Sequence, residues 1–165
     1  MVLFSRPVQQ VATLPFVPID DGFEVLLITS RGGGRWLLPK GWPPGGRDLV
    51  QTARREAEEE AGVVGRLHET PVGSYSYDKE MRQGYRVHCL VVVFPLLVEM
   101  HLLSWLEQHE RQRRWGKLAD VAAMVAHRNL AHLLSGLAAD DGARLRAAMT
   151  AIDGAAVAES PRSAY

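Results

Sequence analysis

The 165-residue sequence has one cysteine, no net charge and no long apolar run, and each shortage argues against a class of protein. Cys89 has no second cysteine for an internal disulfide, and its apolar neighbours predict a buried, unreactive thiol. Nineteen Lys and Arg balance nineteen Asp and Glu, so the overall charge does not indicate a nucleic acid polymer as partner. The longest apolar run, residues 89–97, contains Pro95 and is too short to cross a membrane.

The size and the N-terminus of the sequence predict a single-domain protein of the cytoplasm. Residues 1–7 lack a basic region followed by an apolar stretch, so no secretory signal is expected. A hydrophobic content of 47% predicts one globular domain over residues 1–152, with a flexible C-terminal tail over residues 153–165. The sequence leaves open whether the protein is a monomer or a homodimer.

The order of apolar and polar segments predicts an α/β (α+β) fold in which helices cover a mixed sheet. Pro15 and Pro18 favour an edge strand or an irregular strand over residues 9–19. A hairpin is predicted around the glycine-rich turn of residues 30–34. The expected strands cover residues 23–29, 35–38, 66–77, 86–98 and 115–118, and the expected helices cover residues 49–61, 119–127, 130–137 and 143–152.

The helix over residues 49–61 has predicted ends and a predicted packing face. Asp48 suits the N-cap, with Gln51 three residues later, and Gly62 suits the C-terminal end. The small side chains of Ala53, Ala57 and Ala61 recur on one side of the helix. We expect that side to pack closely against the sheet.

Three glutamates recur on another face of the same helix. Glu56, Glu59 and Glu60 are spaced i, i+3 and i+4, which brings their mutually repelling carboxylates together. A magnesium or manganese ion among them would offset that repulsion, because hard divalent ions prefer carboxylate oxygens. Taken alone, the helix equally allows a solvated acidic surface on which Arg54 pairs with Glu58.

The flanking residues make the pattern specific. The segment Gly41-x5-Arg47-x7-Arg55-Glu56-Ala57-Glu58-Glu59-Glu60-Ala61-Gly62-Val63 resembles the Nudix box, the loop-helix-loop signature of pyrophosphate hydrolases. A looser pattern through residues 73–77, 105–107 and 113–115 is similar to the diphosphoinositol polyphosphate phosphohydrolase-like branch. The resemblance implies a Nudix-type α/β/α sandwich with a mixed sheet.

The resemblance also implies an activity and a cofactor. The expected reaction is divalent-metal-dependent hydrolysis of a phosphoanhydride in a nucleoside diphosphate linked to another group, such as a diadenosine polyphosphate or a diphosphoinositol polyphosphate. Glu56, Glu59, Glu60 and the carbonyl of Lys40 would hold Mg²⁺ or Mn²⁺, and Arg55 would orient a glutamate of the box. The alternative is a catalytically weak Nudix-fold protein that binds a ligand or regulates.

The general base is left open by the sequence. By analogy with the family, an acid on a later loop is expected to serve, and Glu107 and Glu110 are the candidates. Both are equally consistent with solvated loop acids.

The expected partner is a small phosphoanhydride substrate. Basic residues surround the glycine-rich stretches before the helix and are candidates for binding its phosphates: Arg31, Arg35, Lys40 and Arg47. Trp36 and Trp42 flank the same loop, where one could stack on a base. Arg47 departs from the family pattern, which has glutamate there, so it is either a phosphate contact or a solvent-facing replacement that lowers metal affinity.

Overall fold

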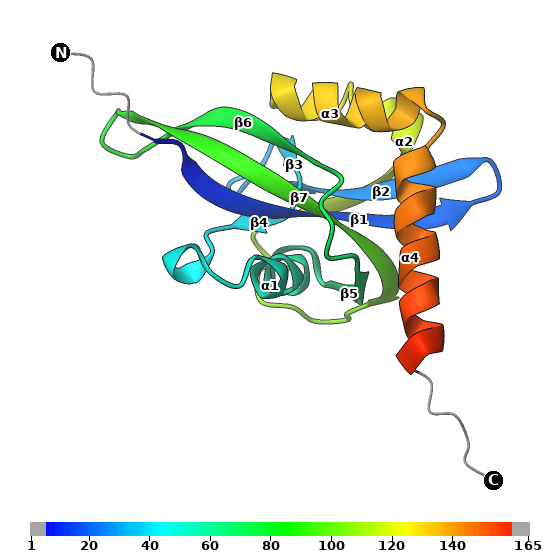
Figure 1. The fold of residues 1–165 in the computed structure, drawn as a ribbon. Helices are drawn as coiled ribbons and strands as arrows, with labels where there is room; N and C mark the ends of the chain where they lie inside the picture. The colour runs from blue at the N-terminus through cyan, green and yellow to red at the C-terminus, as the bar shows by residue number, and fades with distance from the viewer. Residues whose placement is uncertain (1–5, 160–165) are drawn as a thin grey trace, which may run out of the picture.

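The computed structural model describes residues 6–159 and has one mixed sheet between helices. Helix α1 (Leu49–Ala61) covers one face of the sheet, and α2 (Leu118–Val121) and α3 (Arg128–Ala139) cover the other (Figure 1). Helix α4 (Ala143–Glu159) runs past the sheet from the α3 side to the α1 side. The strands are β1 (Val8–Ile19), β2 (Gly22–Thr29), β3 (Trp36–Leu37), β4 (Lys40–Gly41), β5 (Val63–Leu67), β6 (Gly73–Glu80), β7 (Arg86–His101) and β8 (Arg113–Lys117).

The strand order confirms the mixed α/β/α architecture. The main path is β3-β2-β1-β7-β5, while β4 pairs with β1, β6 with β7 and β8 with β2. Strands β1 and β7 are parallel from the Val8–Cys89 pair to the Phe16–Leu97 pair, and the other pairs are antiparallel. No helix among residues 6–159 is both long and apolar enough to span a membrane.

Of the two alternatives predicted for residues 9–19, the edge strand is wrong, because β1 lies at the centre of the sheet. Successive N–H groups of a strand point to opposite sides, and the Thr13 N–H bonds to a carbonyl on the β4 side. The backbone nitrogen of Pro15 therefore points to the same side. It lies in the gap between the β1 residues that pair with β4 and those that pair with β2 from Phe16 onward. Pro18 faces β7, beyond the last residue of β1 that β7 pairs with. Neither proline removes a hydrogen bond of the sheet.

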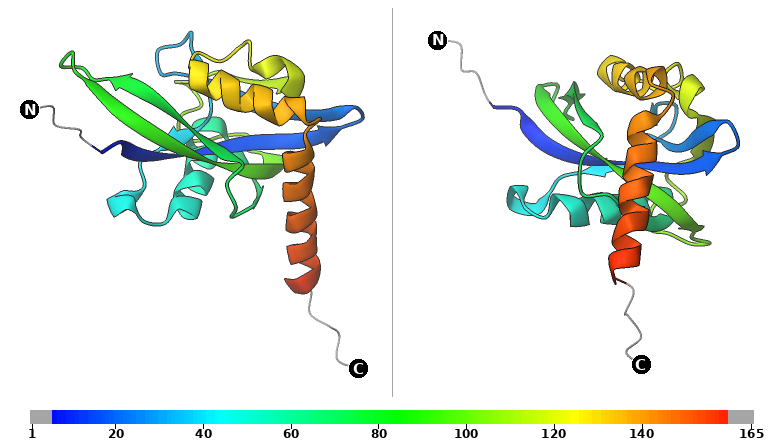
Figure 2. Two further views of the ribbon diagram at one scale, coloured as in Figure 1. Left: turned by 45° about the horizontal axis from the view of Figure 1, so that its top comes forward. Right: turned by 45° about the vertical axis from the view of Figure 1, so that its right-hand side comes forward.

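Apolar side chains form a separate core on each face of the sheet, and the two views of Figure 2 keep α1 and α3 on opposite sides. On the α1 face, the apolar side chains that the helix buries fully are small, while Leu49 and Val50 at its start are partly buried against the same core. Ala53, Ala57 and Ala61 are each 0% exposed and pack against β7 residues such as Phe94. The opposite core is built on leucines of α3, namely Leu130, Leu134 and Leu137.

Three further segments differ from the predictions by more than a few residues. The single strand expected over residues 66–77 is two strands, β5 and β6, which pair with different parts of β7. The helix expected over residues 119–127 is the single turn α2. Helix α4 continues through Glu159, so residues 153–159 are helical rather than a tail, and residues 160–165 lie outside the described part of the chain.

The bounds of α1 agree with the prediction, but its N-terminal cap does not. Asp48 adopts a left-handed conformation and makes no capping hydrogen bond through its side chain. At the other end, Gly62 has φ +63°, and its N–H bonds to carbonyls of the last turn. Arg113 donates to the carbonyls of Ala61 (2.9 Å) and Gly62 (3.2 Å), with its guanidinium 4.0 Å from the ring centre of Trp105. The loop after β7 is thereby fastened to the end of α1.

We expect Gly62→Ala to destabilise the protein by about 2 to 4 kcal/mol, because alanine is strained at positive φ and its Cβ would overlap the Trp105 ring. Gly46→Ala is the matched control, since Gly46 has φ +72° but no atom within 4 Å of an added Cβ. That control should cost about 1 kcal/mol. Urea unfolding measures both, and equal losses would contradict the role of Trp105.

Candidate active site

The acidic turn of α1 carries carboxylates that the fold withdraws from water. Glu60 is 8% exposed, and Glu56 and Glu59 are half-buried. Burial raises the pKa of Glu60 to about 7; Arg111 opposes this rise and the charge of Glu56 adds to it. Burial also raises the pKa of Glu56, and the charge of Glu59 adds to that effect. Nearby positive charge therefore compensates the carboxylates of this turn only in part.

Gly41 leaves the space that Glu56 occupies. A Cβ at position 41 would overlap the Glu56 carboxyl group, so a larger residue would displace it. Arg55 lies on the other side, with Nη2 3.8 Å from Glu56 Oε1. The Glu56 side chain of α1 thus fits into the space that the missing side chain of Gly41 leaves.

Both oxygens of Glu60 accept hydrogen bonds from elsewhere in the fold. The Lys40 N–H donates to Oε2 at 3.2 Å, and Arg111 Nη2 donates to Oε1 at 3.3 Å. Arg111 also donates through Nε to Glu107 Oε1 at 3.2 Å and through Nη1 to the Thr29 carbonyl at 3.0 Å. One guanidinium therefore joins α1, the end of β2 and the loop after β7.

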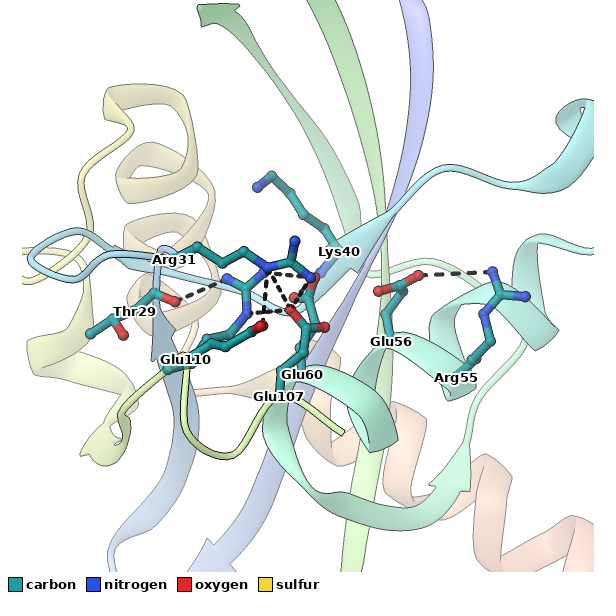
Figure 3. Close-up of polar contacts among 9 residues, drawn as sticks. Thr29, Arg31, Lys40, Arg55, Glu56, Glu60, Glu107 and Glu110 are labelled. Carbon is teal, nitrogen blue, oxygen red and sulfur yellow. Dashed lines mark hydrogen bonds and ion pairs between the residues drawn. The ribbon is translucent and has the colours of Figure 1, made fainter. Parts of the chain in front are cut away.

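Arg31 extends these contacts to a second guanidinium (Figure 3). Its Nη2 lies 2.7 Å from Glu107 Oε1, and its Nε lies 3.2 Å from Glu110 Oε2. The Glu107 N–H donates to the Glu59 carbonyl at 3.0 Å, which ties this loop to α1. We call the set the ion-pair network; its members are Arg31, Glu60, Glu107, Glu110 and Arg111.

The acidic turn fits a hard divalent cation in its chemistry. Its donors are carboxylate oxygens, and burial raises the cost of their charge. Within residues 6–159, no three Asp, Glu, His or Cys side chains already converge on one point. The spacing of Glu56, Glu59 and Glu60 places them on one side of a single helix, and their side chains would have to rotate to bring their oxygens to one ion.

A second group of side chains lies on the other side of Lys40. The side chain of Lys40 points away from the carboxylates in Figure 3, and its Nζ is 5.3 Å from the ring centre of Tyr77. Tyr77 packs on His127 at 4.4 Å between ring centres, and Lys79 Nζ lies 5.1 Å from the ring centre of Trp42. We call Lys40, Trp42, Tyr77, Lys79 and His127 the basic-aromatic cluster.

Positive charge in this cluster is not neutralised by acids. Among the described side chains, neither Lys40 nor Lys79 forms an ion pair with a carboxylate. Burial, together with the charges of Lys40 and Arg35, lowers the pKa of His127 to about 4. Burial also lowers the pKa of Lys40. The cluster is therefore suited to an anionic ligand with an aromatic part.

The other predicted phosphate-binding arginines have different surroundings. Arg31 is engaged with two carboxylates, so it is not a free positive charge. Arg35 is exposed near His127. Arg47 is exposed in the loop before α1 and forms no ion pair among the described residues. This exposure agrees with the prediction that Arg47 faces solvent. Its contact with a substrate phosphate stays a prediction.

Sequence reasoning missed Arg111, Tyr77 and His127. Arg111 follows Glu107 by four residues, which is a spacing typical of an ion pair, but the segment is not a helix. Tyr77 and His127 are 50 positions apart in the chain and meet only through the packing of α3 over β6. No local pattern could have paired them.

The family model of the NUDIX domain matches residues 10–135 of the chain. The chain therefore belongs to the Nudix family. Nudix hydrolase 18, mitochondrial, of Arabidopsis thaliana is 38% identical over 100 residues, which cover 61% of this chain and 54% of the relative. Nudix hydrolase 17, mitochondrial, of the same plant is 38% identical over 97 residues, covering 59% and 51%. The chain thus spans about half the length of the curated relatives that it matches.

Solved structures share the fold. A C. elegans Ap4A hydrolase has a TM-score of 0.59 at 22% identity, covering 81% of this chain and 98% of that chain. The NUDIX domain of Shewanella oneidensis NrtR, in complex with ADP ribose, has a TM-score of 0.55 at 24% identity, covering 81% and 88%. A NUDIX hydrolase from Nitrosomonas europaea reaches a TM-score of 0.63 at 19% identity, covering 82% and 91%.

We expect Glu60 to make the metal-free protein less stable as pH rises. Its pKa is about 7 in the fold, above the ordinary glutamate value of 4.5, so the folded state holds the proton more tightly. The resulting stabilisation is complete below pH 4.5 and is lost as pH rises to about 7. In EDTA, the free energy of unfolding should fall relative to that of Glu60→Gln by on the order of 3 kcal/mol across that window. Glu58→Gln, at an exposed site, should keep the wild-type slope, and parallel curves for wild type and Glu60→Gln would contradict the assignment.

Proposed function

We propose that the protein is a Mg²⁺- or Mn²⁺-dependent hydrolase that cleaves a phosphoanhydride bond in a nucleoside diphosphate linked to another group. The observation that carries this proposal is the placement of Lys40 between two opposite environments. Its backbone N–H contacts the buried Glu60 carboxylate, and its side chain enters the basic-aromatic cluster. A pyrophosphate beside Lys40 would therefore lie between acids that hold metal and cations that hold phosphate.

The chain's own groups have distinct roles in the proposed reaction. Glu56, Glu59 and Glu60 would hold the ion, with the Lys40 carbonyl as a further ligand, and Arg55 would orient Glu56. A bound divalent ion would act as a Lewis acid that draws negative charge from the pyrophosphate oxygens. Gly41 keeps the Glu56 carboxyl group close to β4 because it has no side chain.

The candidates for the general base differ in their surroundings. Glu107 is 6% exposed, and its Oε1 accepts hydrogen bonds from both Arg31 and Arg111, so two guanidinium groups hold this carboxylate in place. The Glu110 side chain is 52% exposed, and its one ion pair within residues 6–159 is with Arg31 Nε, at 3.2 Å. We therefore assign Glu107 to positioning and keep Glu110 as the candidate base.

The basic-aromatic cluster favours a substrate that has both phosphates and a base, such as a diadenosine polyphosphate. Its rings offer stacking surfaces, with Trp42 40% exposed, and its lysines offer charge to phosphates. A diphosphoinositol polyphosphate, the other predicted class, would use the lysines but not the rings. The fold likeness to an Ap4A hydrolase is consistent with the first class.

We expect the double variant Glu59→Gln and Glu60→Gln to abolish hydrolysis. A panel of dinucleoside polyphosphates, ADP-ribose and diphosphoinositol compounds with Mg²⁺ provides the assay. Losing even a residue that supports a metal ligand costs about 10- to 100-fold, so the loss here should be roughly 100-fold or more. Glu58→Gln is the matched control, because Glu58 is exposed on the same helix.

Two results of that assay would contradict the proposal. One is turnover that the double variant leaves unchanged. The other is tight binding of a nucleotide by the wild type without any turnover, which would favour the alternative of a ligand-binding or regulatory Nudix protein.

We expect Lys40→Met to raise the KM for a diadenosine polyphosphate by roughly 10- to 100-fold, since it removes a charge-assisted contact to phosphate. The effect on kcat should be smaller, because the backbone atoms that face Glu60 are retained. Lys117→Met is the control, since Lys117 is exposed and pairs with Asp21 on another part of the surface. A lower kcat at unchanged KM would contradict the phosphate-binding role.

A further inference from the structure

The charges of the ion-pair network are unequal, and Glu60 carries the excess. Arg31 and Arg111 supply two positive charges, against the negative charges of Glu60, Glu107 and Glu110. Without Glu60, the two arginines and the other two glutamates balance. The Glu60 carboxylate can therefore change its partner without leaving the remaining charges uncompensated.

Arg111 is held in place mainly by groups outside α1. Its side chain is 11% exposed and donates to the Thr29 carbonyl at 3.0 Å and to Glu107 at 3.2 Å. Only Nη2 reaches Glu60, and at 3.3 Å this is the longest of the three contacts. Losing the contact with Glu60 would leave the guanidinium bound through its other nitrogens.

We propose that Arg111 is the counter-cation of the acidic turn in the metal-free protein and that it yields Glu60 to the divalent ion when the ion binds. The inference rests on the proposed function, because it requires the ion at α1. Arg111 is then a positioning residue that sets metal affinity. It lowers that affinity through the repulsion of like charges, and it stabilises the buried carboxylate while no ion is present.

The geometry assigns the two oxygens of Glu60 different parts in this exchange. Oε2 accepts from the Lys40 N–H, a backbone contact that fixes the carboxylate against β4. Oε1 accepts from Arg111 and is the oxygen released. Glu56 and Glu59, the other proposed ligands, lie on the same face of α1 as Glu60.

The test is the Mn²⁺ affinity of the full chain, measured by electron paramagnetic resonance of free Mn²⁺ during titration. Arg111→Met removes the charge but keeps an unbranched side chain of similar length, and it should tighten Mn²⁺ binding by about tenfold or more. In EDTA the same variant should melt below the wild type, and saturating Mn²⁺ should raise its Tm by more than it raises that of the wild type. Weaker or unchanged Mn²⁺ binding would overturn the inference, since a residue that only held Glu60 in shape would produce that result.

Glu107→Gln provides an independent second variant with the opposite sign. It removes a negative charge beside Arg111, so Mn²⁺ binding should weaken by about threefold or more. Tightening in this variant would overturn the inference even if Arg111→Met failed to fold. Arg111→Lys keeps the charge and should bind Mn²⁺ within about threefold of the wild type, whereas tightening like that of the methionine variant would also overturn it. Arg114→Met, at an exposed position of β8, should leave the affinity unchanged.

The wild-type titration separates this inference from the proposed function. Absence of Mn²⁺ binding by the wild type, or binding unaffected by Glu59→Gln with Glu60→Gln, would overturn both. Binding that the glutamate variants abolish, together with no tightening in Arg111→Met, would overturn only the role of Arg111.

Discussion

The site depends on the close approach of α1 to the sheet. The side of α1 that faces β1 and β7 carries alanines, and the Thr13 hydroxyl donates to the Ala53 carbonyl at 2.6 Å. A sheet side chain can reach the helix backbone in this way only when no larger side chain separates them. The same approach lets the Lys40 N–H reach Glu60 and requires glycine at position 41 beside Glu56.

Burial gives the carboxylates of α1 their chemical character. An exposed glutamate has its charge stabilised by water, whereas Glu60 relies on one backbone N–H and one guanidinium. Because these two partners compensate its charge only in part, a further cation would stabilise the Glu60 carboxylate. The cations of the basic-aromatic cluster lie beyond β4, so the two kinds of charge are separated by the backbone of Lys40.

The sequence predicts the parts of the molecule that depend on local pattern. The bounds of α1, its alanine face and its C-terminal Gly62 follow from spacing and from the conformational freedom of glycine. The hairpin of β2 and β3 follows from turn residues between apolar runs. The central place of β1 does not follow, because a proline disfavours a central strand unless its missing N–H happens to face a gap.

The parts of the site that the sequence does not reveal are those built from distant segments. Arg111 joins Glu60 only because the loop after β7 folds back onto the end of α1. Arg31 is predicted to bind phosphate, since the residues next to it in the sequence do not identify its charge partners. In the structure, Glu107 and Glu110 hold its guanidinium. Charge partners across such separations are set by tertiary packing, which local spacing does not encode.

The parallel pairing of β1 with β7 also constrains when the protein can assemble. Residues 8–16 pair with residues 89–97, which are roughly 80 positions later. The two central strands therefore cannot pair until the intervening chain has been synthesised. Helix α1 lies within that interval. Nascent α1 therefore lacks Phe94 and Leu96 of its core, and Arg111 beside Glu60, until the second half of the chain has been made.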